Sequence, residues 1–349
     1  MTPYSFLDDY SEGAHPEILD ALVESNLSQQ APYGTDRFSA EAATRIKARL
    51  GASFQGDVHF VPGGTMANIV SISSCLRPHE AVIAVDSGHI VVREAGAIEA
   101  TGHKLITVPA VNGKLTPAHI EAALAANGHF PHMARPRLLY VSNATETGTI
   151  YTLAELREIS ALARQRGLLF FLDGARLGAA LASHRNDATL ADIAALVDLF
   201  WIGGTKVGAL LGEAIVVCNP ALAQDFAFHI KQRGGMLAKG RLLGIQFNAL
   251  FGERDLYTAN ARHANAMASK LASGIAAKGY ALSAEVETNQ IFPILPDPVI
   301  AALQAHFAFY VWSKASPGHS VVRLVTSWAT DEHQVDNLLS RLGSAVGRP

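Results

Sequence analysis

The sequence predicts an α/β protein with a mostly parallel, seven-stranded sheet in a large domain, followed by a smaller C-terminal α+β domain. Short apolar runs alternate with longer helical patterns from about residue 40 to residue 220. The runs are hydrophobic at nearly every position, as in strands that are covered on both faces. The alternation stops after residue 220, which indicates a second unit. The predicted strands are Val58–Val61, Ala81–Val85, Leu105–Val108, Leu138–Val141, Leu168–Leu172, Leu199–Ile202 and Ala214–Val217.

Several segments between these strands have the periodicity of amphipathic helices. The segment Leu153–Arg166 is an example, because its apolar side chains recur on one face, at Leu153, Leu156, Ile159, Leu162 and Ala163. Such a face packs on a sheet. Parallel strands need crossover connections, so the alternation predicts helices on both faces of the sheet.

The chain after residue 220 has a mixed pattern, typical of a small α+β domain packed at one end of the large one. The predicted elements are a long helix at Arg254–Ala277, a strand at Gln290–Leu295, a helix at Pro298–Ala305, strands at Phe307–Trp312 and Val321–Thr326, and a last helix from Asp331. We therefore divide the chain into an N-terminal segment (residues 1–30), a large domain (residues 31–250) and a small domain (residues 251–349).

The composition excludes several classes of function. The chain carries 28 lysines and arginines against 31 aspartates and glutamates, and it has no basic tract, so neither nucleic acid nor an anionic membrane is an expected partner. Cys75 and Cys218 lack the spacing of metal ligands, and no metal site is predicted. The N-terminus has no signal peptide, and no apolar stretch approaches membrane-spanning length, which predicts a cytoplasmic protein.

Lys206 follows an apolar strand, where a solvated lysine is not expected. The run Asp198-Leu-Phe-Trp-Ile-Gly-Gly-Thr-Lys206 ends in a Gly-Gly-Thr turn, and apolar residues flank the lysine on both sides. A lysine in an apolar pocket has a lowered pKa and becomes a nucleophilic amine, able to form a Schiff base with an aldehyde. Alternatively, the side chain extends from the strand end into solvent.

A glycine turn joins another strand to a helix in Val61-Pro-Gly-Gly-Thr-Met-Ala-Asn68. Gly63 and Gly64 let the backbone approach a ligand, and Thr65 is the expected N-cap. Free N–H groups at the positive end of a helix suit a phosphate. The turn is neither a Walker loop nor a dinucleotide fingerprint, which argues against NTP and NAD. It can also be a turn without a ligand.

Asp173 ends the apolar run Leu168-Leu-Phe-Phe-Leu-Asp173, and Arg176 follows three residues later. A carboxylate in this position needs a cation or hydrogen-bond donors. Asp173 can cap a helix predicted at Gly174–Leu181, which leaves Arg176 without a role. Alternatively, Asp173 pairs with a protonated ring nitrogen, and Arg176 binds a phenolate or a carboxylate.

His89 follows the strand Ala81–Val85, in the motif Asp86-Ser-Gly-His89. An isolated histidine is commonly structural, but at a strand end its ring can stack on an aromatic cofactor or transfer a proton. Ligands of parallel sheets collect at the carboxyl ends of the strands, where His89, Asp173, Lys206 and the glycine turn are all expected. Pyridoxal 5′-phosphate (PLP) is the common cofactor that needs a phosphate cup, an anion for its ring nitrogen, a stacking ring and a Schiff-base lysine.

These motifs, in this order, resemble those of the threonine aldolases, low-specificity L-threonine aldolase type. The resemblance covers nearly the whole chain and rests on Tyr33-Gly-Thr-Asp36, Pro62-Gly-Gly-Thr-Met-Ala-Asn68, Gly88-His89, Glu94-Ala-Gly96, Asp173-Gly-Ala-Arg176, Gly204-Thr-Lys206 and Val322-Arg-Leu-Val-Thr326. It implies the aspartate-aminotransferase-like PLP fold (fold type I). It also implies a homo-oligomer, usually a tetramer, with active sites at subunit interfaces.

The resemblance assigns a role to each matching residue. It makes Lys206 the Schiff-base lysine, Asp173 the partner of the ring nitrogen and His89 the stacking ring. It gives cofactor contacts to Gly64, Thr65 and Thr205, and the substrate carboxylate to Arg176 and Arg323, with Asp8 and Tyr33 as further substrate-binding residues. Arg323 lies in the apolar strand Val321–Val325, where a buried guanidinium needs an anion. The basic residues Lys231, Arg233 and Lys239 either reach a neighbouring subunit's phosphate or form a solvated helix face.

Two positions depart from the family pattern. A serine commonly precedes the N-terminal aspartate, and here Leu7 is placed at that position, beside Asp8. A second histidine near the substrate hydroxyl is replaced by Glu146, which can still accept a proton. The base for the β-hydroxyl is therefore left open between His89, Glu146 and a water molecule that they hold.

The resemblance implies retro-aldol cleavage of L-threonine, L-allo-threonine and related β-hydroxy-α-amino acids to glycine and an aldehyde. Another PLP reaction on an amino acid is the nearest alternative, namely β-elimination, transamination or racemisation. A PLP-binding protein without turnover and a nucleotide-binding module are the alternatives from other classes. The set of Lys206, Asp173, His89 and Arg323 argues against the PLP-binding protein without turnover. The absence of a yellow chromophore from the pure protein would be needed to favour the nucleotide-binding module.

Overall fold

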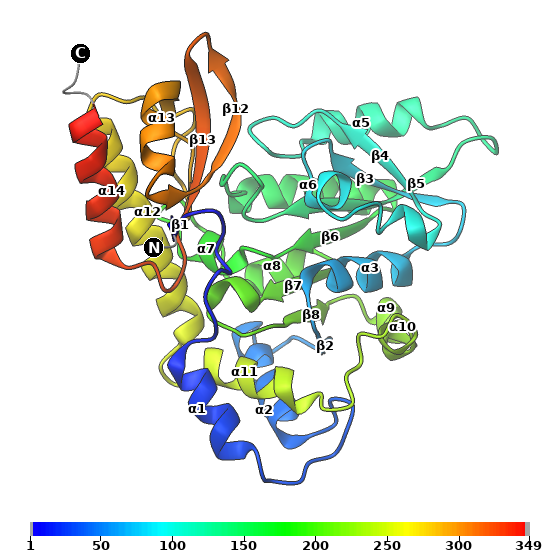
Figure 1. The fold of residues 1–349 in the computed structure, drawn as a ribbon. Helices are drawn as coiled ribbons and strands as arrows, with labels where there is room; N and C mark the ends of the chain where they lie inside the picture. Colours follow the sequence, from blue (N-terminus) through cyan, green and yellow to red (C-terminus); the bar gives the residue numbers. More distant parts are fainter. Residues whose placement is uncertain (1–2, 346–349) are drawn as a thin grey trace.

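Seven strands form one sheet in the computed structural model, which describes residues 3–345 (Figure 1). The strands are β2 (Asp57–Val61), β3 (Glu80–Val85), β4 (Lys104–Val108), β5 (Arg135–Ser142), β6 (Leu169–Asp173), β7 (Leu199–Gly203) and β8 (Glu213–Val217). Their order is β2-β8-β7-β6-β5-β3-β4, and only β8 runs antiparallel to its neighbours within this sheet. The predicted mostly parallel, seven-stranded sheet is confirmed.

Side chains of the sheet alternate between two hydrophobic cores because successive residues of a strand point to opposite faces. In β3, for example, Ala81 and Ile83 belong to one core, whereas Val82 and Ala84 belong to the other. The first core is covered by α1 (Pro16–Ser25), α2 (Arg37–Arg49), α5 (Pro117–Ala126), α6 (Leu153–Arg166), α7 (Leu177–Leu181), α8 (Leu190–Leu196) and α11 (Arg241–Leu250). The second is covered by α3 (Gly64–Cys75), α4 (His89–Val92), α9 (Pro220–Ala223) and α10 (Phe226–Gln232). No helix within residues 3–345 is long and apolar enough to cross a membrane.

The C-terminal part of the chain builds a third core beside the sheet (Figure 1). Its elements are α12 (Leu256–Ala277), β9 (Gln290–Ile291), β10 (Ile294–Pro296), α13 (Asp297–Gln304), β11 (Phe307–Ala308), β12 (Tyr310–Ser316), β13 (His319–Val325) and α14 (Glu332–Ala345). The strand predicted at Gln290–Leu295 is divided into β9 and β10 around Pro293, which lacks an N–H for a ladder hydrogen bond. The predicted domain boundary at residue 250 stays a prediction, and residues 1–2 and 346–349 of the predicted outer segments lie outside the described residues.

The N-terminal segment connects the two parts of the molecule. Strand β1 (Tyr4–Ser5) pairs with β11, and Phe6 packs in the C-terminal core. Ten residues later, α1 contributes Ile18 to a core of the large sheet. The chain between β1 and α1 therefore connects the two units (Figure 1). It brings Asp9 into contact with Arg176 and Tyr10 to the cavity at the carboxyl ends of the strands.

Candidate active site

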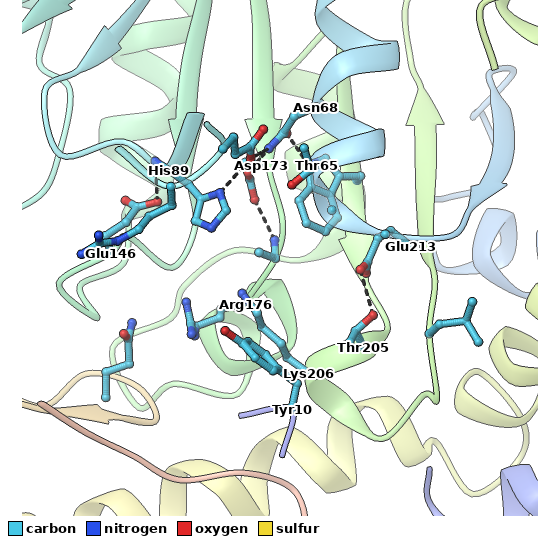
Figure 2. Close-up of a pocket in the computed structure, with 18 of the residues that line it drawn as sticks. Tyr10, Thr65, Asn68, His89, Glu146, Asp173, Arg176, Thr205, Lys206 and Glu213 are labelled. Carbon is cyan, nitrogen blue, oxygen red and sulfur yellow. Dashed lines mark hydrogen bonds and ion pairs between the residues drawn. The ribbon is translucent and has the colours of Figure 1, made fainter. Parts of the chain in front are cut away.

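A cavity of about 810 Å³ lies at the carboxyl ends of the parallel strands and is closed on one side by the C-terminal unit. It brings together nine of the eleven site residues predicted from the sequence: Gly64, Thr65, His89, Glu146, Asp173, Arg176, Thr205, Lys206 and Arg323. Figure 2 shows several of these side chains pointing into the same space from different elements. Asp8 and Tyr33 do not line it.

Asp173 is the last residue of β6, and its carboxylate is buried. Its Oδ2 accepts hydrogen bonds from the hydroxyl of Tyr140 (2.6 Å) and from Nδ2 of Asn68 (3.0 Å). Oδ1 accepts the N–H of Ala175 (2.9 Å), so Asp173 also caps the turn that follows the strand. Among residues 3–345 no lysine, arginine or histidine pairs with it. A buried carboxylate without a countercharge fits a protonated ring nitrogen.

A chain of hydrogen bonds extends from Asp173 to His89. The amide of Asn68 donates to both Asp173 and Oε1 of Glu94 (2.7 Å), and its oxygen accepts Nε1–H of Trp201 (3.1 Å). Oε1 of the buried Glu94 lies 2.7 Å from Nδ1 of His89. This contact fixes the orientation of the imidazole ring at the end of β3, as a carboxylate bonded to one ring nitrogen does for histidines that bind metals.

Gly174 lets the chain turn sharply after Asp173. A Cβ atom on this residue would lie 1.7 Å from the carbonyl oxygen of Trp201, so the neighbouring strand leaves no room for a side chain. We expect Gly174→Ala to lower the free energy of unfolding by about 3 kcal/mol or more, measured by urea denaturation. Gly13→Ala is the matched control, because a Cβ atom there meets nothing within 4 Å. Equal stability of the two variants would contradict the close approach.

Lys206 lies in a 3₁₀ turn (Thr205–Val207) just after β7, and its amine faces the cavity. Its Nζ is 5.9 Å from the centre of the Tyr10 ring (Figure 2). Burial lowers the pKa of Lys206, and the positive charge of Arg176 lowers it further, against the opposing effect of Asp9, Asp173 and Glu213. A larger share of neutral amine makes Lys206 a better nucleophile.

Arg176 is held by Asp9, the residue that follows the predicted substrate-binding residue Asp8. Its Nε and Nη2 donate to the two carboxylate oxygens of Asp9, at 2.7 and 3.0 Å. Burial alone raises the pKa of Asp9, but the charges of Arg176 and Lys206 outweigh burial and lower that pKa to about 2. Asp8 instead accepts the N–H of Tyr10 and the hydroxyl of Ser11 near the surface. Asp8 does not line the cavity of the described chain, and the adjacent Asp9 is the aspartate that contacts Arg176. The role of Asp8 as a substrate-binding residue stays a prediction.

Arg323 projects from β13 into the cavity. Its Nε donates to Oε1 of Gln290 (3.0 Å), and its guanidinium carbon lies 5.4 Å from the centre of the Trp312 ring. No carboxylate pairs with it among the described residues. The terminal nitrogens of Arg323 therefore remain available for an anion, the arrangement that a substrate carboxylate requires.

The turn before α3 forms the opposite wall of the cavity. Gly63 is the N-cap of α3, without a side-chain cap, and Thr65 is its second residue, so the expectation of Thr65 as N-cap was wrong. The hydroxyl of Thr65 is consequently not committed to capping the helix. A Cβ atom on Gly64 would lie 3.0 Å from the Trp201 ring. The first N–H groups of a 12-residue helix and two threonine hydroxyls, those of Thr65 and Thr205, fit a phosphate group.

Glu213 holds the segment that carries Thr205 and Lys206. Its Oε1 accepts the hydroxyl of Thr205 (2.9 Å; Figure 2), and its Oε2 accepts the N–H of Gly204 (2.8 Å). Burial raises the pKa of this carboxyl group to about 7, more than its hydrogen bonds to Gly204 and Thr205 and the charge of Lys206 lower it. Glu213 is therefore protonated in the folded protein over a pH range in which it ionises in the unfolded chain.

This raised pKa predicts the direction in which stability changes with pH. The folded protein binds one proton more than the unfolded chain between the usual glutamate pKa of 4.5 and about pH 7. The Glu213 contribution is complete below pH 4.5 and is lost as the pH rises through 7, by about 1.4 kcal/mol per pH unit. We expect Glu213→Gln to flatten the unfolding free energy over this range, measured with urea at a fixed concentration of the cofactor-free protein. An unchanged slope would contradict the assignment.

Glu146 lies in the loop after β5, at the position where the family pattern has a histidine. Its Oε1 accepts the backbone N–H of His89 (3.1 Å) and the hydroxyl of Ser142 (2.9 Å). Burial raises the pKa of Glu146, and the nearby charge of Asp173 raises it further. A raised pKa makes the carboxylate form of Glu146 a stronger proton acceptor.

Tyr33 lies outside the cavity and is half-exposed. Nζ of Lys231 is 4.1 Å from the centre of its ring. The described chain therefore does not bring Tyr33 to the other predicted substrate-binding residues.

The cavity and its hydrogen-bond network contain further residues that were not predicted as site residues, among them Asp9, Asn68, Tyr140, Trp201, Glu213 and Gln290. Asn68 stood within the glycine-turn motif, so its position was a usable signal. Tyr140 and Trp201 lie inside apolar strands, where the sequence indicates only core packing. Burial and the neighbouring Asp173 raise the pKa of Tyr140, which keeps its hydroxyl a hydrogen-bond donor.

The chain is similar to known proteins over nearly its whole length. The family model of the beta-eliminating lyases matches residues 6–297. A low-specificity L-threonine aldolase from Pseudomonas sp. (strain NCIMB 10558) is 34% identical over 347 residues, which cover 98% of this chain and 97% of that protein. The solved structure of a Leishmania major threonine aldolase is 48% identical, with a TM-score of 0.96 and coverage of 99% of this chain and 100% of that one.

The fold is shared more widely. A variant of Thermus thermophilus aspartate aminotransferase is only 15% identical but has a TM-score of 0.68, with coverage of 98% of this chain and 91% of that one. The predicted aspartate-aminotransferase-like fold type I and the resemblance to the threonine aldolases are thereby confirmed. The chain belongs to the beta-eliminating lyase family, a family of enzymes, and within it to the threonine aldolases.

Proposed function

We propose that this enzyme uses PLP to cleave L-threonine, L-allo-threonine and related β-hydroxy-α-amino acids to glycine and an aldehyde. The observation that carries the proposal is that the amine of Lys206 and the carboxylate of Asp173 line the same cavity. Lys206 has an amine with a lowered pKa, and Asp173 has a buried carboxylate without a cationic partner among the described residues. A ligand with an electrophilic carbon and a protonated ring nitrogen, as PLP has, satisfies both groups at once.

The residues around the cavity fit PLP on several sides. Lys206 would hold the cofactor covalently, Asp173 would bind its ring nitrogen and His89 would stack on its ring. The N-terminus of α3, with Gly64 and Thr65, and the hydroxyl of Thr205 would bind the phosphate. When bound, PLP supplies an acceptor for the electron pair that is released when the Cα–Cβ bond breaks.

Arg323 and Arg176 would orient the substrate through its carboxylate. Arg323 has free terminal nitrogens, whereas Asp9 already occupies Nε and Nη2 of Arg176. Arg323 is therefore the main carboxylate ligand, and Arg176 contributes through Nη1 to the carboxylate or to the phenolate oxygen of the cofactor. A fixed carboxylate restricts rotation about the Cα bonds, so that the breaking bond keeps its reactive orientation.

The β-hydroxyl proton needs an acceptor within the same cavity. Glu146 and His89 are joined by the hydrogen bond from the His89 N–H to Oε1 of Glu146. Glu146 has a raised pKa, and its Oε2 has no hydrogen-bond partner among residues 3–345. We assign Glu146, directly or through a water molecule, as the group that takes this proton, with His89 beside it.

Glu146→Gln tests this role. The amide keeps the shape of the side chain but cannot take a proton, so we expect aldehyde release from L-threonine to fall by about 10²-fold. The wild-type rate should also decline at low pH as the raised pKa is crossed, and this decline should be lost in the variant. Both are measured as kcat/KM between pH 5 and 9. A wild-type rate and pH profile in Glu146→Gln would contradict the assignment.

The proposal includes a homotetramer with active sites between subunits, as the resemblance to threonine aldolases implies. Apolar side chains on and just after α1 support an interface, because Leu19, Val23 and Leu27 are exposed in the single chain. Tyr33 and Lys231 lie outside the cavity of their own subunit and would reach the cavity of a neighbour. Light scattering should give four times the mass of the chain. A monomer that retains full activity would contradict this arrangement.

Aldehyde release from the purified, PLP-loaded protein tests the proposed function. L-Threonine and L-allo-threonine are added separately, and acetaldehyde is followed with alcohol dehydrogenase and NADH. Release from either diastereomer supports the proposal, and the ratio of the rates gives the preference. No aldehyde from these two or from phenylserine would overturn it.

β-Elimination is the second candidate, favoured by the match to the beta-eliminating lyase family model. Elimination from L-threonine breaks the Cβ–O bond and yields 2-oxobutyrate and ammonia, without acetaldehyde. Measurement of 2-oxobutyrate with lactate dehydrogenase in the same samples separates the two reactions.

A further inference from the structure

The mouth of the cavity holds a cation that the proposed reaction does not use. Arg93 lines the cavity directly after α4 and is exposed to solvent. Its guanidinium carbon lies 5.8 Å from the centre of the Trp312 ring. Among residues 3–345 no carboxylate forms an ion pair with Arg93, and its side chain makes no hydrogen bond to the protein. The guanidinium is therefore held over an aromatic ring with its donors free.

The other charged groups of the cavity are already accounted for. Asp9 neutralises Arg176, Arg323 is assigned to the substrate carboxylate, and Lys206 and the phosphate-binding residues to the cofactor. The carboxylates of Glu94 and Glu146 bond to His89, Asn68 or Ser142 rather than to Arg93. An α-amino acid with an uncharged side chain therefore has no further anionic group that Arg93 could bind.

The neighbours of Arg93 indicate which group of a bound substrate would lie near its guanidinium. Its N–H bonds to the carbonyl of His89, so both residues belong to one helical turn, and His89 lies beside the proposed base for the β-hydroxyl. Arg93 and Arg323 both contact the ring of Trp312, at 5.8 and 5.4 Å. In a substrate whose carboxylate is held by Arg323 and whose hydroxyl lies near His89, a further group on the β-carbon would be directed toward Arg93.

We propose that Arg93 and Trp312 form a subsite for an anionic β-substituent, so that the enzyme accepts β-hydroxy-α-amino acids with a second carboxylate, such as 3-hydroxyaspartate. This inference rests on the proposed function. Two carboxylate carbons separated by three C–C bonds are about 4 Å apart, a spacing that two arginines on one tryptophan ring can bind together. Cleavage breaks the Cα–Cβ bond and leaves its electron pair on the amino-acid side, which takes up a proton to become glycine. The hydroxyl loses its proton, and its oxygen becomes the carbonyl oxygen of glyoxylate, so no oxidant or reductant is required.

Equilibrium binding tests the subsite without turnover of a β-hydroxy substrate. L-Aspartate and L-asparagine have nearly the same shape, carry no β-hydroxyl and differ in the charge of the side chain. We expect calorimetric titration of the PLP-loaded protein to give a Kd for L-aspartate about tenfold below that for L-asparagine. In Arg93→Gln this preference should disappear, and Arg93→Lys should keep part of it. Arg157→Gln, an exposed arginine on α6 outside the cavity, should keep all of it.

A wild-type protein that binds L-asparagine as tightly as L-aspartate would overturn the subsite, as would Arg93→Gln with the wild-type preference. Thermal melting of Arg93→Gln confirms that the variant is folded. Aldehyde assays with 3-hydroxyaspartate, L-threonine and phenylserine complete the test, and a preference for the aryl substrate over the acidic one would also contradict the subsite. If L-aspartate is preferred but no substrate releases aldehyde, the proposed reaction fails and the anion subsite stands. If L-threonine is cleaved but the preference is absent, only the subsite fails.

Discussion

Lys206→Ala is expected to reduce aldehyde release from L-threonine by about 10⁴-fold or more. The amine of Lys206 faces the cavity, and burial and Arg176 lower its pKa, which suits the role that we propose for it, the nucleophile that would hold the cofactor. Borohydride reduction of the PLP-loaded wild type, followed by peptide mass spectrometry, should locate the pyridoxyl group on the peptide that contains Lys206. The variant should lack this modification.

Lys104→Ala is the matched control for this variant. Lys104 is an exposed lysine at the start of β4, outside the cavity. Its replacement should leave both the labelling of Lys206 and aldehyde release at the wild-type level. Pyridoxyl label on another lysine, or full activity in Lys206→Ala, would contradict the role of Lys206.

Asp173→Asn is expected to lower kcat/KM by about 10³-fold while the protein remains folded. Asn has the same shape but no negative charge, so it cannot stabilise a protonated ring nitrogen, whose charge makes the cofactor an effective electron acceptor. The loss corresponds to about 4 kcal/mol of transition-state stabilisation. Part of the hydrogen-bond network with Tyr140 and Asn68 can persist.

A structural role of Asp173 predicts a different result, because the residue also caps the turn at Ala175. Asp198→Asn separates the two roles. Asp198 accepts the N–H of Phe170 and the amide of Asn219 and does not line the cavity, so its loss should reduce stability but not the activity of the folded fraction. If both variants lose activity only in proportion to their unfolding, Asp173 acts as a cap and not as the partner of a cofactor.

The sheet could be predicted from the sequence chiefly because its five inner strands, β3 and β5 to β8, are buried on both faces and are nearly continuous apolar runs. The edge strands β2 and β4 are partly exposed, but all seven strands were found within a few residues of their observed ends. The C-terminal strands were located less accurately. The run Phe307–Trp312 divides into β11 and β12, and β12 is exposed along its length, so its burial pattern differs from that of the central sheet.

Site residues that follow a strand end could be predicted from the sequence. Site residues that lie inside a helix or strand, or that join the site from a distant part of the chain, were missed. Asp173 and Lys206 follow apolar strands closely, and a charged side chain there is conspicuous. Asp9 becomes part of the site only through its contact with Arg176, 167 residues away, and nothing local distinguishes it from Asp8. Glu213 is the first residue of β8, where the sequence alone suggests a charge at the surface. Only the folded structure shows that its carboxyl group is buried and bonded to Thr205.

The cleavage itself is tested most directly by measuring glycine and acetaldehyde together in one reaction of the PLP-loaded protein with L-threonine. The proposed function predicts equal amounts of the two products, matching the threonine consumed, and neither product with Lys206→Ala. Consumption of threonine with 2-oxobutyrate and ammonia as products, or no consumption by a protein that carries PLP on Lys206, would contradict it.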